Sequence, residues 1–317
     1  MNNEQLIMNV GANCVRPPID VNGIKAICGK YGATFMEGVP VAPYTSFRIG
    51  GKCNIVKINK TELLAELLQY CRDNNVTRYI LGNGSNVLIS DDGLSGLVLL
   101  FGNDFGKIVV ENEYISCQAG AKLSDICNAA LENSLTGLEF AYGIPGTAGG
   151  ALYMNAGAYG GEIKDVVRGC SYLNENCDKL KMKLPEMSLS YRHSVFCEND
   201  WVITHVLFRL EKGEPMAIKA RMDEVMAARR EKQPLEFPSG GSTFKRPEGY
   251  FAAKLIDDSG LRGYSVGGAQ VSEKHCGFVI NRDRATFSDV TELIKYVKDE
   301  VFNKTGIPLE CEIRIIK

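Results

Sequence analysis

The sequence predicts a protein of mixed helices and strands that is divided into two or three domains. Short apolar runs that suit strands alternate along the chain with amphipathic helical segments, and glycines gather in clusters between them. The chain has 317 residues. At roughly 100–200 residues per domain, this length is too great for one core of ordinary size.

Strands and helices alternate in the first half of the chain. Residues 61–74 are a predicted helix because Leu64, Leu67, Leu68 and Cys71 recur at helical spacing. Residues 123–133 are a second predicted amphipathic helix, which ends before Gly137. Short apolar runs predict strands at residues 54–58, 79–81, 97–101, 107–110 and 114–118.

The second half opens with a strand and a long helix. Residues 201–210 alternate apolar and other side chains and predict the strand. The helix is predicted at residues 215–232, with a proline in its first turn, and we expect a domain boundary at the turn Lys212-Gly213 just before it. After this helix we expect a helix at 251–257, a strand at 277–281 and a terminal strand at 309–316. Between the last two strands we expect a helix capped by Ser288, whose apolar face carries Val290, Leu293, Ile294, Val297 and Val301.

Composition and charge exclude several classes of protein. The chain has 36 Lys and Arg and 38 Asp and Glu, a formal net charge of −2, so it is not a globally basic nucleic-acid binder. The start MNNEQLIMNV lacks a signal-peptide pattern, and no apolar stretch approaches the about 20 residues that span a bilayer. We therefore expect a cytoplasmic protein without membrane insertion. The 11 cysteines lack metal-site spacing, so we expect no bound metal and free thiols in the core.

Two glycine clusters suit phosphate groups. Gly82-Asn83-Gly84-Ser85-Asn86 follows a predicted strand, and successive backbone N–H groups in such a turn can form an anion nest. A tight hairpin turn is an equally good interpretation. Residues 143–150, which include four glycines, lead into a helix-compatible segment and resemble a phosphate cradle at a helix N-terminus. Neither cluster matches the dinucleotide fingerprint G-x-G-x-x-G or the P-loop.

Two segments in the last third carry groups that can do chemistry. Ser242 places a hydroxyl near the cations Lys245 and Arg246, which suits an anionic substrate beside a proton donor. Taken alone, that segment is explained slightly better by a solvated turn. Glu312 lies opposite the apolar face of the terminal strand, and it either faces solvent or projects into a cleft.

The end of the long helix carries three cations, Arg229, Arg230 and Lys232. Cations at a helix C-terminus complement the helix dipole, so a structural role suffices to explain them. The same groups would clamp a diphosphate if this helix end faces a cleft.

Seven segments, taken in order, resemble one family. They are residues 45–51 (TSFRIGG), 81–86 (LGNGSN), 144–150 (IPGTAGG), 155–160 (NAGAYG), 191–194 (YRHS), 241–245 (GSTFK) and 309–314 (LECEIR). Together they resemble UDP-N-acetylenolpyruvoylglucosamine reductase, the flavoenzyme of bacterial peptidoglycan precursor synthesis. The resemblance covers roughly residues 40–317, and seven ordered motifs argue strongly against chance agreement.

The resemblance implies an α+β fold in three parts. Residues 40–212 would form an FAD-binding module of the vanillyl-alcohol-oxidase type with two subdomains, and residues 213–317 a substrate-binding α+β domain. Residues 1–39 carry no motif that we can assign. One branch of the family has a tyrosine-bearing insertion after the strand at 201–210. This chain lacks it and resembles the shorter branch.

The resemblance also implies the bound molecules. NADPH would give a hydride to non-covalently held FAD, and reduced FAD would pass it to the enolpyruvyl group of a UDP-sugar to form UDP-N-acetylmuramate. We expect the chain to act as a monomer. The implied FAD contacts are Thr45, Arg48, Gly82, Asn83, Gly84, Ser85, Asn86, Gly143, Ile144, Pro145, Gly146, Thr147, Gly149, Gly150 and Ile163.

Three residues are implied to be catalytic: Arg192, Ser242 and Glu312. Hydride addition to an enol ether conjugated with a carboxylate makes an enolate-like species. Arg192 and Glu312 can hold that carboxylate if Glu312 is protonated or bridges through hydrogen bonds, and Ser242 would donate the proton, assisted by Lys245 or a water relay. The implied substrate contacts are Tyr159, Arg192, Arg229, Lys232, Lys245 and Arg246.

Two other functions compete with this one. Another FAD oxidase or dehydrogenase of the same fold would often tether its flavin to a histidine, and none of His193, His205 and His275 lies in a glycine-rich loop. A non-catalytic sugar-nucleotide sensor would have kept the pocket, but it would not need the three chemically apt residues.

Overall fold

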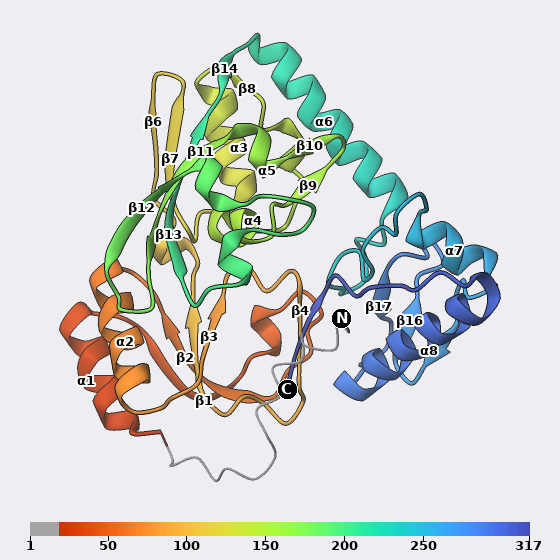
Figure 1. The fold of residues 1–317 in the computed structure, drawn as a ribbon, viewed down its shortest axis with the longest axis horizontal. Helices are drawn as coiled ribbons and strands as arrows, with labels where there is room; N and C mark the ends of the chain where they lie inside the picture. The colour runs from red at the N-terminus through yellow and green to blue at the C-terminus, as the bar shows by residue number, and fades with distance from the viewer. Residues whose placement is uncertain (1–18) are drawn as a thin grey trace.

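The computed structural model describes residues 19–317 and shows an α+β protein in three parts (Figure 1). The first subdomain is a four-stranded sheet of order β1-β2-β5-β3, in which β5 runs parallel to both neighbours and β1 antiparallel to β2. Its elements are β1 (Phe35–Pro40), β2 (Lys52–Lys57), β3 (Arg78–Leu81), β5 (Leu97–Leu100), α1 (Val21–Tyr31) and α2 (Thr61–Asp73).

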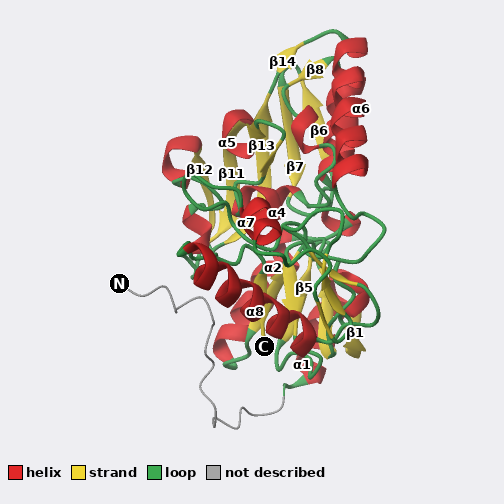
Figure 2. Ribbon diagram, turned by 90° about the vertical axis from the view of Figure 1, so that its right-hand side faces the viewer, coloured by secondary structure: helices red, strands yellow, loops and turns green. Residues whose placement is uncertain are grey.

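The second subdomain is a five-stranded antiparallel sheet of order β12-β11-β13-β7-β6. It lies above the first sheet in Figure 2, and buried side chains of both sheets belong to one continuous core. Its elements are β6 (Ile108–Glu111), β7 (Tyr114–Gln118), β11 (Val167–Leu173), β12 (Lys179–Lys183), β13 (Val202–Arg209), α3 (Leu123–Glu132) and α4 (Ala148–Tyr153).

The third part has a core of its own and forms the blue lobe in Figure 1. It contains β15 (Ser265–Val266), β16 (Ala269–Val271), β17 (Val279–Asn281), α7 (Ala252–Asp258) and α8 (Phe287–Thr305). The chain then leaves this lobe, and its last strand β18 (Arg314–Ile316) pairs in parallel with β4 (Val87–Ile89), which directly follows the first subdomain's β3.

Short elements complete the described chain. They are β8 (Leu135–Thr136), β9 (Gly157–Ala158), β10 (Gly161–Glu162), β14 (Glu211–Lys212), α5 (Ile163–Val166) and the 3₁₀ turns Ala42–Tyr44, Asn103–Phe105, Glu139–Ala141, Leu184–Met187 and Val195–Cys197. The helix α6 (Pro215–Lys232) links the second subdomain to the third part (Figure 1).

Most elements expected from the sequence are confirmed within two residues, but three details are wrong. α4 begins at Ala148, inside the glycine run. The cap of α8 is Thr286, whose hydroxyl accepts from the Asp289 N–H, and not Ser288. The terminal strand covers Arg314–Ile316 alone, because the preceding residues cross between parts and make only an isolated bridge.

The packing of α6 indicates where the boundary between the FAD-binding module and the third domain lies. Its buried residues Ile218 and Met222 belong to the main core, with the second subdomain. α1 and β1, which no sequence motif marked, likewise pack with the first subdomain. We therefore propose that the third domain begins after Lys232 and that the FAD-binding module includes residues 21–40.

Two expectations from composition can be compared with the described residues. Ten cysteines lie there, and all ten are free thiols, seven of them buried as expected for core residues. Burial raises the pKa of Cys117 and of Cys127 to about 12. Within residues 19–317, no helix is long and apolar enough to cross a bilayer.

The substitution Gly84→Ala tests how closely the loops of the first subdomain pack. Gly84 has a φ of 59°, and an added Cβ would lie 2.1 Å from the backbone oxygen of Tyr44, which cannot move aside cheaply. We expect the midpoint of thermal unfolding, followed by circular dichroism, to fall by about 5 °C or more. The control is Gly29→Ala, at an exposed position inside α1 with open space around its Cβ, which should stabilise by about 0.5–1 kcal/mol. Equal midpoints for the two variants would contradict this packing.

Candidate active site

The loop at residues 82–86 lies between two other loops. It joins β3 to β4, but β3 pairs with β5 and β4 with β18, which rules out the hairpin interpretation. On one side, the Ser46 N–H donates to the Gly84 carbonyl at 3.0 Å. On the other, Asn83 Nδ2 donates to the Pro145 carbonyl at 2.8 Å. The two glycine clusters predicted to bind phosphate are therefore in contact.

The backbone of residues 82–86 offers free donors. None of its five N–H groups donates to an acceptor within residues 19–317. A Cβ on Gly82 would lie 2.5 Å from Thr147 Oγ1, so only glycine allows the neighbouring loop this close. Successive unpaired N–H groups form the kind of nest that binds oxyanions, and the segment therefore fits a diphosphate.

In the segment at residues 143–150, several of the backbone N–H groups expected to bind phosphate are hydrogen-bonded within the protein. The N–H groups of Ala148 and Gly149 donate at 2.8 and 2.9 Å to backbone oxygens in the stretch before α3, and the Thr147 hydroxyl accepts from Gly150 at 3.4 Å. The expected cradle at a helix N-terminus is therefore largely occupied by the protein itself. Gly149 allows α4 to pack closely against Ala119, since a Cβ on Gly149 would lie 2.8 Å from the Cβ of Ala119.

Arg229, near the end of α6, lies against the start of this segment. A Cβ on Gly143 would be 2.8 Å from its Cδ. The guanidinium is half-buried, it has no hydrogen-bond or ion-pair partner among the described residues, and burial lowers its pKa. Tyr159 is close enough to act on this charge. A desolvated cation without an anion, beside a glycine-rich loop, fits a bound phosphate.

Arg192 lies in a tight turn whose ends are Ser190 and His193. The backbone groups of these two residues pair at 3.1 and 3.2 Å, and Arg192 has a left-handed φ of 55°. The buried amide of Asn155 holds the turn, because its Nδ2 donates to the Ser190 carbonyl at 2.9 Å and its Oδ1 accepts from the Lys164 N–H at 2.9 Å. Such enforced backbone strain is common at functional sites.

Arg192 and Glu312 form a nearly buried ion pair. Arg192 Nε donates to Glu312 Oε1 at 2.6 Å, and the two side chains are 19% and 12% exposed. Arg192 Nη2 also donates to the Gly157 carbonyl at 3.3 Å, while its Nη1 has no partner within the described chain. Burial raises the pKa of Glu312, and the charges of Arg192 and Lys245 oppose that rise only in part. Glu312 thus projects into the site and not into solvent.

Ser242 lies beside this pair. The Glu312 N–H donates to the Thr243 carbonyl and the Lys245 N–H to the Glu310 carbonyl, both at 2.8 Å, so the two segments run side by side. The Ser242 side chain is exposed, and its hydroxyl bonds to none of the described residues. The arrangement brings the segment of Ser242 next to Glu312 and leaves Arg192 Nη1 free to donate to an acceptor such as a carboxylate.

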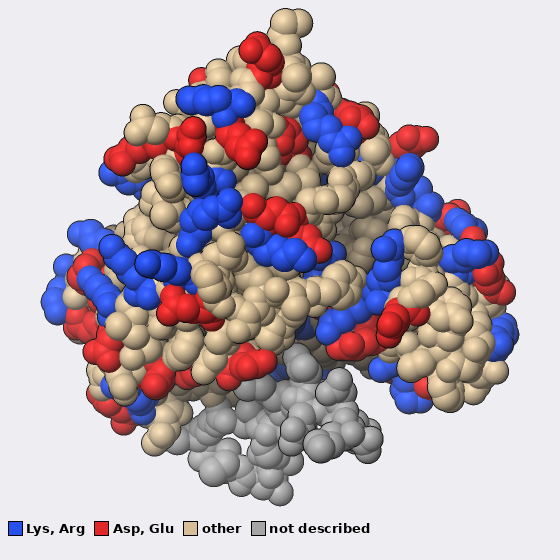
Figure 3. Space-filling model, turned by 45° about the horizontal axis from the view of Figure 1, so that its top comes forward, with Lys and Arg blue, Asp and Glu red and all other residues tan. Residues whose placement is uncertain are grey.

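Other expected site residues lie around these groups. Lys245 pairs with Glu310, and the exposed Arg246 is stacked over the Phe251 ring at 4.0 Å. Lys232 and Arg48 are exposed, without an ion-pair partner among residues 19–317. Figure 3 shows Lys and Arg side chains along the recess between the C-terminal lobe and the rest of the molecule.

The side chains of Thr45 and Ile163, two expected FAD contacts, are used within the protein itself. The buried Thr45 hydroxyl donates to the carbonyls of Ala42 and Ile49, both at 3.1 Å. Ile163 is fully buried in the main core. The Thr45 hydroxyl can therefore offer a cofactor only its acceptor lone pairs, and Ile163 could contact one only through its backbone.

Sequence reasoning missed two groups of residues at the site. Arg314 donates to the Tyr153 hydroxyl and lies over its ring at 5.1 Å. It follows Glu312 by two residues, and this short spacing was the available signal. The second is Phe47, whose side chain is buried in the core of the third part and whose carbonyl accepts from Asn281 at 3.0 Å. Nothing local in the sequence marks that contact.

Comparisons with known proteins agree on one family. Residues 54–181 match the family described as FAD binding domain, and residues 233–316 match UDP-N-acetylenolpyruvoylglucosamine reductase, C-terminal domain. The Clostridium novyi protein of that name is 49% identical over 274 residues, which cover 86% of this chain and 89% of its own. The Caldanaerobacter subterraneus protein is 48% identical, covering 87% and 92%. The crystal structure of the Thermus caldophilus reductase aligns with a TM-score of 0.77 and 31% identity, over 90% of this chain and 99% of its own.

The pKa of Glu312 tests the electrostatics of the site. Burial raises it, and the charge and hydrogen bond of Arg192 are the largest opposing influences, followed by Lys245. We therefore expect Arg192→Met to raise this pKa further and Lys245→Met to raise it by a smaller amount. The titration can be followed by NMR of ¹³C-carboxyl-labelled protein, with Glu312→Gln assigning the signal. A Glu312 pKa that is unchanged in Arg192→Met would show that the two groups do not meet in solution.

Proposed function

The chain belongs to the UDP-N-acetylenolpyruvoylglucosamine reductase family, and we propose the residues by which it performs that family's reaction. It is an FAD-dependent oxidoreductase that uses NADPH to reduce the enolpyruvyl group of UDP-N-acetylglucosamine enolpyruvate, which gives UDP-N-acetylmuramate for peptidoglycan synthesis. The observation that carries the residue assignment is the buried Arg192–Glu312 pair with the free Ser242 hydroxyl beside it.

The residues that would hold FAD follow from the free donors described above. FAD, when bound, accepts a hydride from NADPH and supplies it to the vinyl group of the substrate. The five free N–H groups of residues 82–86 suit its diphosphate. Because Arg229 touches Gly143, we assign its unpaired charge to this same diphosphate and not to that of the substrate. No histidine lies in either loop, so the cofactor would be held without a covalent bond.

Arg192 and Glu312 would bind the carboxylate of the enolpyruvyl group. Arg192 Nη1 is free to donate to it, while Nε and Nη2 are fixed by Glu312 and Gly157. An ionised Glu312 would repel a second carboxylate, but burial raises the pKa of Glu312, so this group is protonated more readily than an exposed glutamate and can then donate a hydrogen bond. Together the two groups would stabilise the negative charge that develops on the carboxylate when hydride adds to the far carbon.

Ser242 would then supply the proton to the carbon that carries the carboxylate. Its hydroxyl is exposed, it is not engaged by the described protein, and it lies one residue from the Thr243 carbonyl that accepts from Glu312. Lys245, whose charge reaches Glu312, would assist the departure of this proton. All of these groups come from one chain, so we propose that a monomer suffices. Its substrates, NADPH and a UDP-sugar, place the reaction in the cytoplasm.

The proposed role of Arg229 is tested by the pair Arg229→Met and Arg230→Met. Both remove one positive charge near the end of α6, but only Arg229 is half-buried against Gly143, while Arg230 is exposed. Loss of a charge-assisted hydrogen bond to phosphate costs about 1.5–3 kcal/mol, so we expect FAD affinity to fall by about tenfold or more in the first variant alone. Titration of the apoprotein with FAD, followed by flavin fluorescence, measures it. Equal affinities in the two variants would refute the assignment.

Ser242→Ala separates the two halves of the reaction. Reduction of FAD by NADPH needs no proton from Ser242, so bleaching of the flavin should proceed at close to the normal rate. Reoxidation by the enolpyruvyl substrate should slow by about a hundredfold or more, the usual loss for a positioned general acid. Ser242→Cys should keep more activity, because a thiol also donates.

Stopped-flow kinetics at several substrate concentrations decides this point. If Ser242 only shapes the turn beside the substrate diphosphate, the alanine variant will bind substrate weakly and saturating substrate will restore the reoxidation rate. That result would show that Ser242 is not the proton donor.

A further inference from the structure

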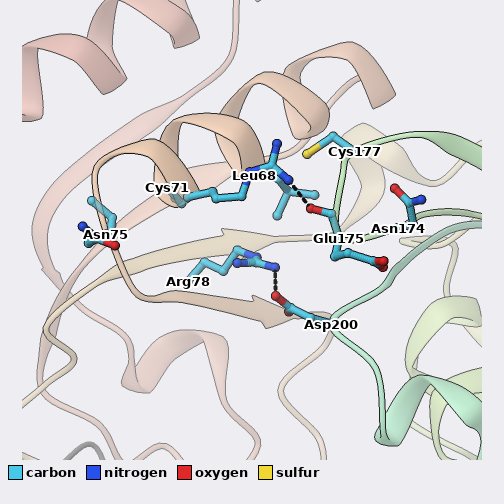
Figure 4. A pocket seen from close by; sticks show the side chains of 10 residues that line it. Leu68, Cys71, Asn75, Arg78, Asn174, Glu175, Cys177 and Asp200 are labelled. Carbon is cyan, nitrogen blue, oxygen red and sulfur yellow. Dashed lines mark hydrogen bonds and ion pairs between the residues drawn. The ribbon is translucent and has the colours of Figure 1, made fainter.

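Arg314 carries a positive charge that the described chain does not balance. Within residues 19–317, four arginines are partly buried and the others are exposed: Arg78, Arg192, Arg229 and Arg314. Arg78 and Arg192 each pair with a carboxylate, as Figure 4 shows for Arg78 and Asp200. Arg229 is assigned above to the diphosphate of FAD. Arg314 alone among the four has neither a carboxylate partner in the described chain nor a role in the proposed reaction.

The side chain of Arg314 lies against Tyr153, the last residue of α4. Its Nη1 donates to the Tyr153 hydroxyl, and the guanidinium lies 5.1 Å from the centre of the tyrosine ring. Burial raises the pKa of Tyr153, so this hydroxyl stays neutral and does not offset the positive charge. The remaining side-chain N–H groups of Arg314 have no acceptor within residues 19–317, but they are not sealed from solvent. A bound molecule can therefore reach them.

Arg314 lies between the groups proposed to hold the cofactor and those proposed to hold the substrate. Its backbone N–H donates to the Asn86 carbonyl at 3.0 Å, at the end of the loop that suits the diphosphate of FAD. The Tyr153 carbonyl accepts from the Ser194 hydroxyl at 2.7 Å, two residues after Arg192. To react with a substrate held at Arg192, the flavin ring has to extend from that loop across this interval.

The substrate carboxylate does not account for Arg314. The charges that act on the Glu312 carboxylate are those of Arg192 and Lys245, and not that of Arg314, although Arg314 is only two residues away in the chain. The guanidinium therefore serves a different part of the site. A flavin that accepts a hydride gains one negative charge, and a nearby charge is one of the means by which proteins tune a flavin.

We propose that Arg314 supplies the positive charge that stabilises FAD in its reduced, negatively charged form. This inference rests on the proposed function, in which FAD carries the hydride from NADPH to the substrate. The oxidised ring is uncharged and gains less from the same cation, so Arg314 raises the reduction potential of the bound flavin. Tyr153 holds the guanidinium in place by accepting one of its hydrogen bonds.

The reduction potential of the bound flavin tests this proposal. The holoenzyme is reduced photochemically in the presence of a reference dye, with neither NADPH nor the sugar nucleotide, and the equilibrium between flavin and dye is read from their spectra. We expect Arg314→Met to shift this equilibrium towards oxidised flavin by about tenfold or more, the usual loss for one charge-assisted hydrogen bond. Arg314→Lys keeps the charge and should restore most of the potential.

Two further variants separate the charge of Arg314 from its contact with α4. Tyr153→Phe removes the hydroxyl that accepts from Arg314 but leaves the cation, so we expect a shift of no more than a few-fold. Arg209→Met removes the positive charge of the exposed Arg209–Glu113 pair and should leave the potential unchanged. If Arg314→Met does not retain FAD, Arg314→Gln gives the same test, because its amide can still donate to Tyr153.

Three results would overturn the proposal. The first is an unchanged potential in the variants that lack the charge of Arg314. The second is an equal loss of affinity for oxidised and reduced FAD, which would assign Arg314 to the diphosphate. The third is a shift in Tyr153→Phe as large as that in Arg314→Met, which would assign the effect to the contact and not to the charge. An error in the proposed catalytic roles does not affect this readout, because neither substrate is present, and it would be detected by the stopped-flow measurements.

Discussion

The contact between Arg192 and Glu312 requires all three parts of the molecule to be in place. Arg192 stands on a turn of the second subdomain, while Glu312 lies on the segment that leaves the third part and ends as β18, paired with β4 beside the first subdomain. Burying two charges costs several kcal/mol per ion before their attraction repays it, so this pair is poor evidence of stability. The proposed role of Arg192 in binding the substrate carboxylate would explain why this pair is buried.

The supporting contacts show how the fold meets that requirement. Asn86 Nδ2 donates to the Glu312 carbonyl at 3.2 Å, and the Arg314 N–H donates to the Asn86 carbonyl at 3.0 Å, so the loop that offers free donors for a diphosphate also fixes the terminal segment. Phe47 enters the core of the third part, and Ser46 donates to the Ser239 carbonyl at 2.6 Å. The loop at residues 82–86, the segment that carries Glu312 and the segment before Ser242 are thus positioned by one connected set of bonds.

The spacing of apolar residues predicted most of the helices and strands, because the period of that spacing shows which face of an element is buried. It could not predict where residues far apart in the chain meet. The direction of Glu312 depends on the Arg192 turn 120 residues away, and the pairing of β18 with β4 is equally remote. The glycine run at 143–150 shows the same limit, because its spacing could not show that carbonyls far away in the chain accept from the N–H groups of Ala148 and Gly149. The choice of Arg192, Ser242 and Glu312 as candidate catalytic residues came from ordered motifs and not from spacing.

We propose that Arg192 and Glu312 act as one unit on the substrate carboxylate. A double-mutant cycle tests it most directly, with the rate of flavin reoxidation by the enolpyruvyl substrate measured in Arg192→Lys, Glu312→Gln and the double variant. Lysine keeps the charge but cannot reproduce the separate bonds to Glu312 and Gly157. We expect each single variant to lose about a hundredfold or more in this rate, and the double variant to be no slower than the slower single variant. Losses that multiply in the double variant would show that the two residues act independently, and would contradict it.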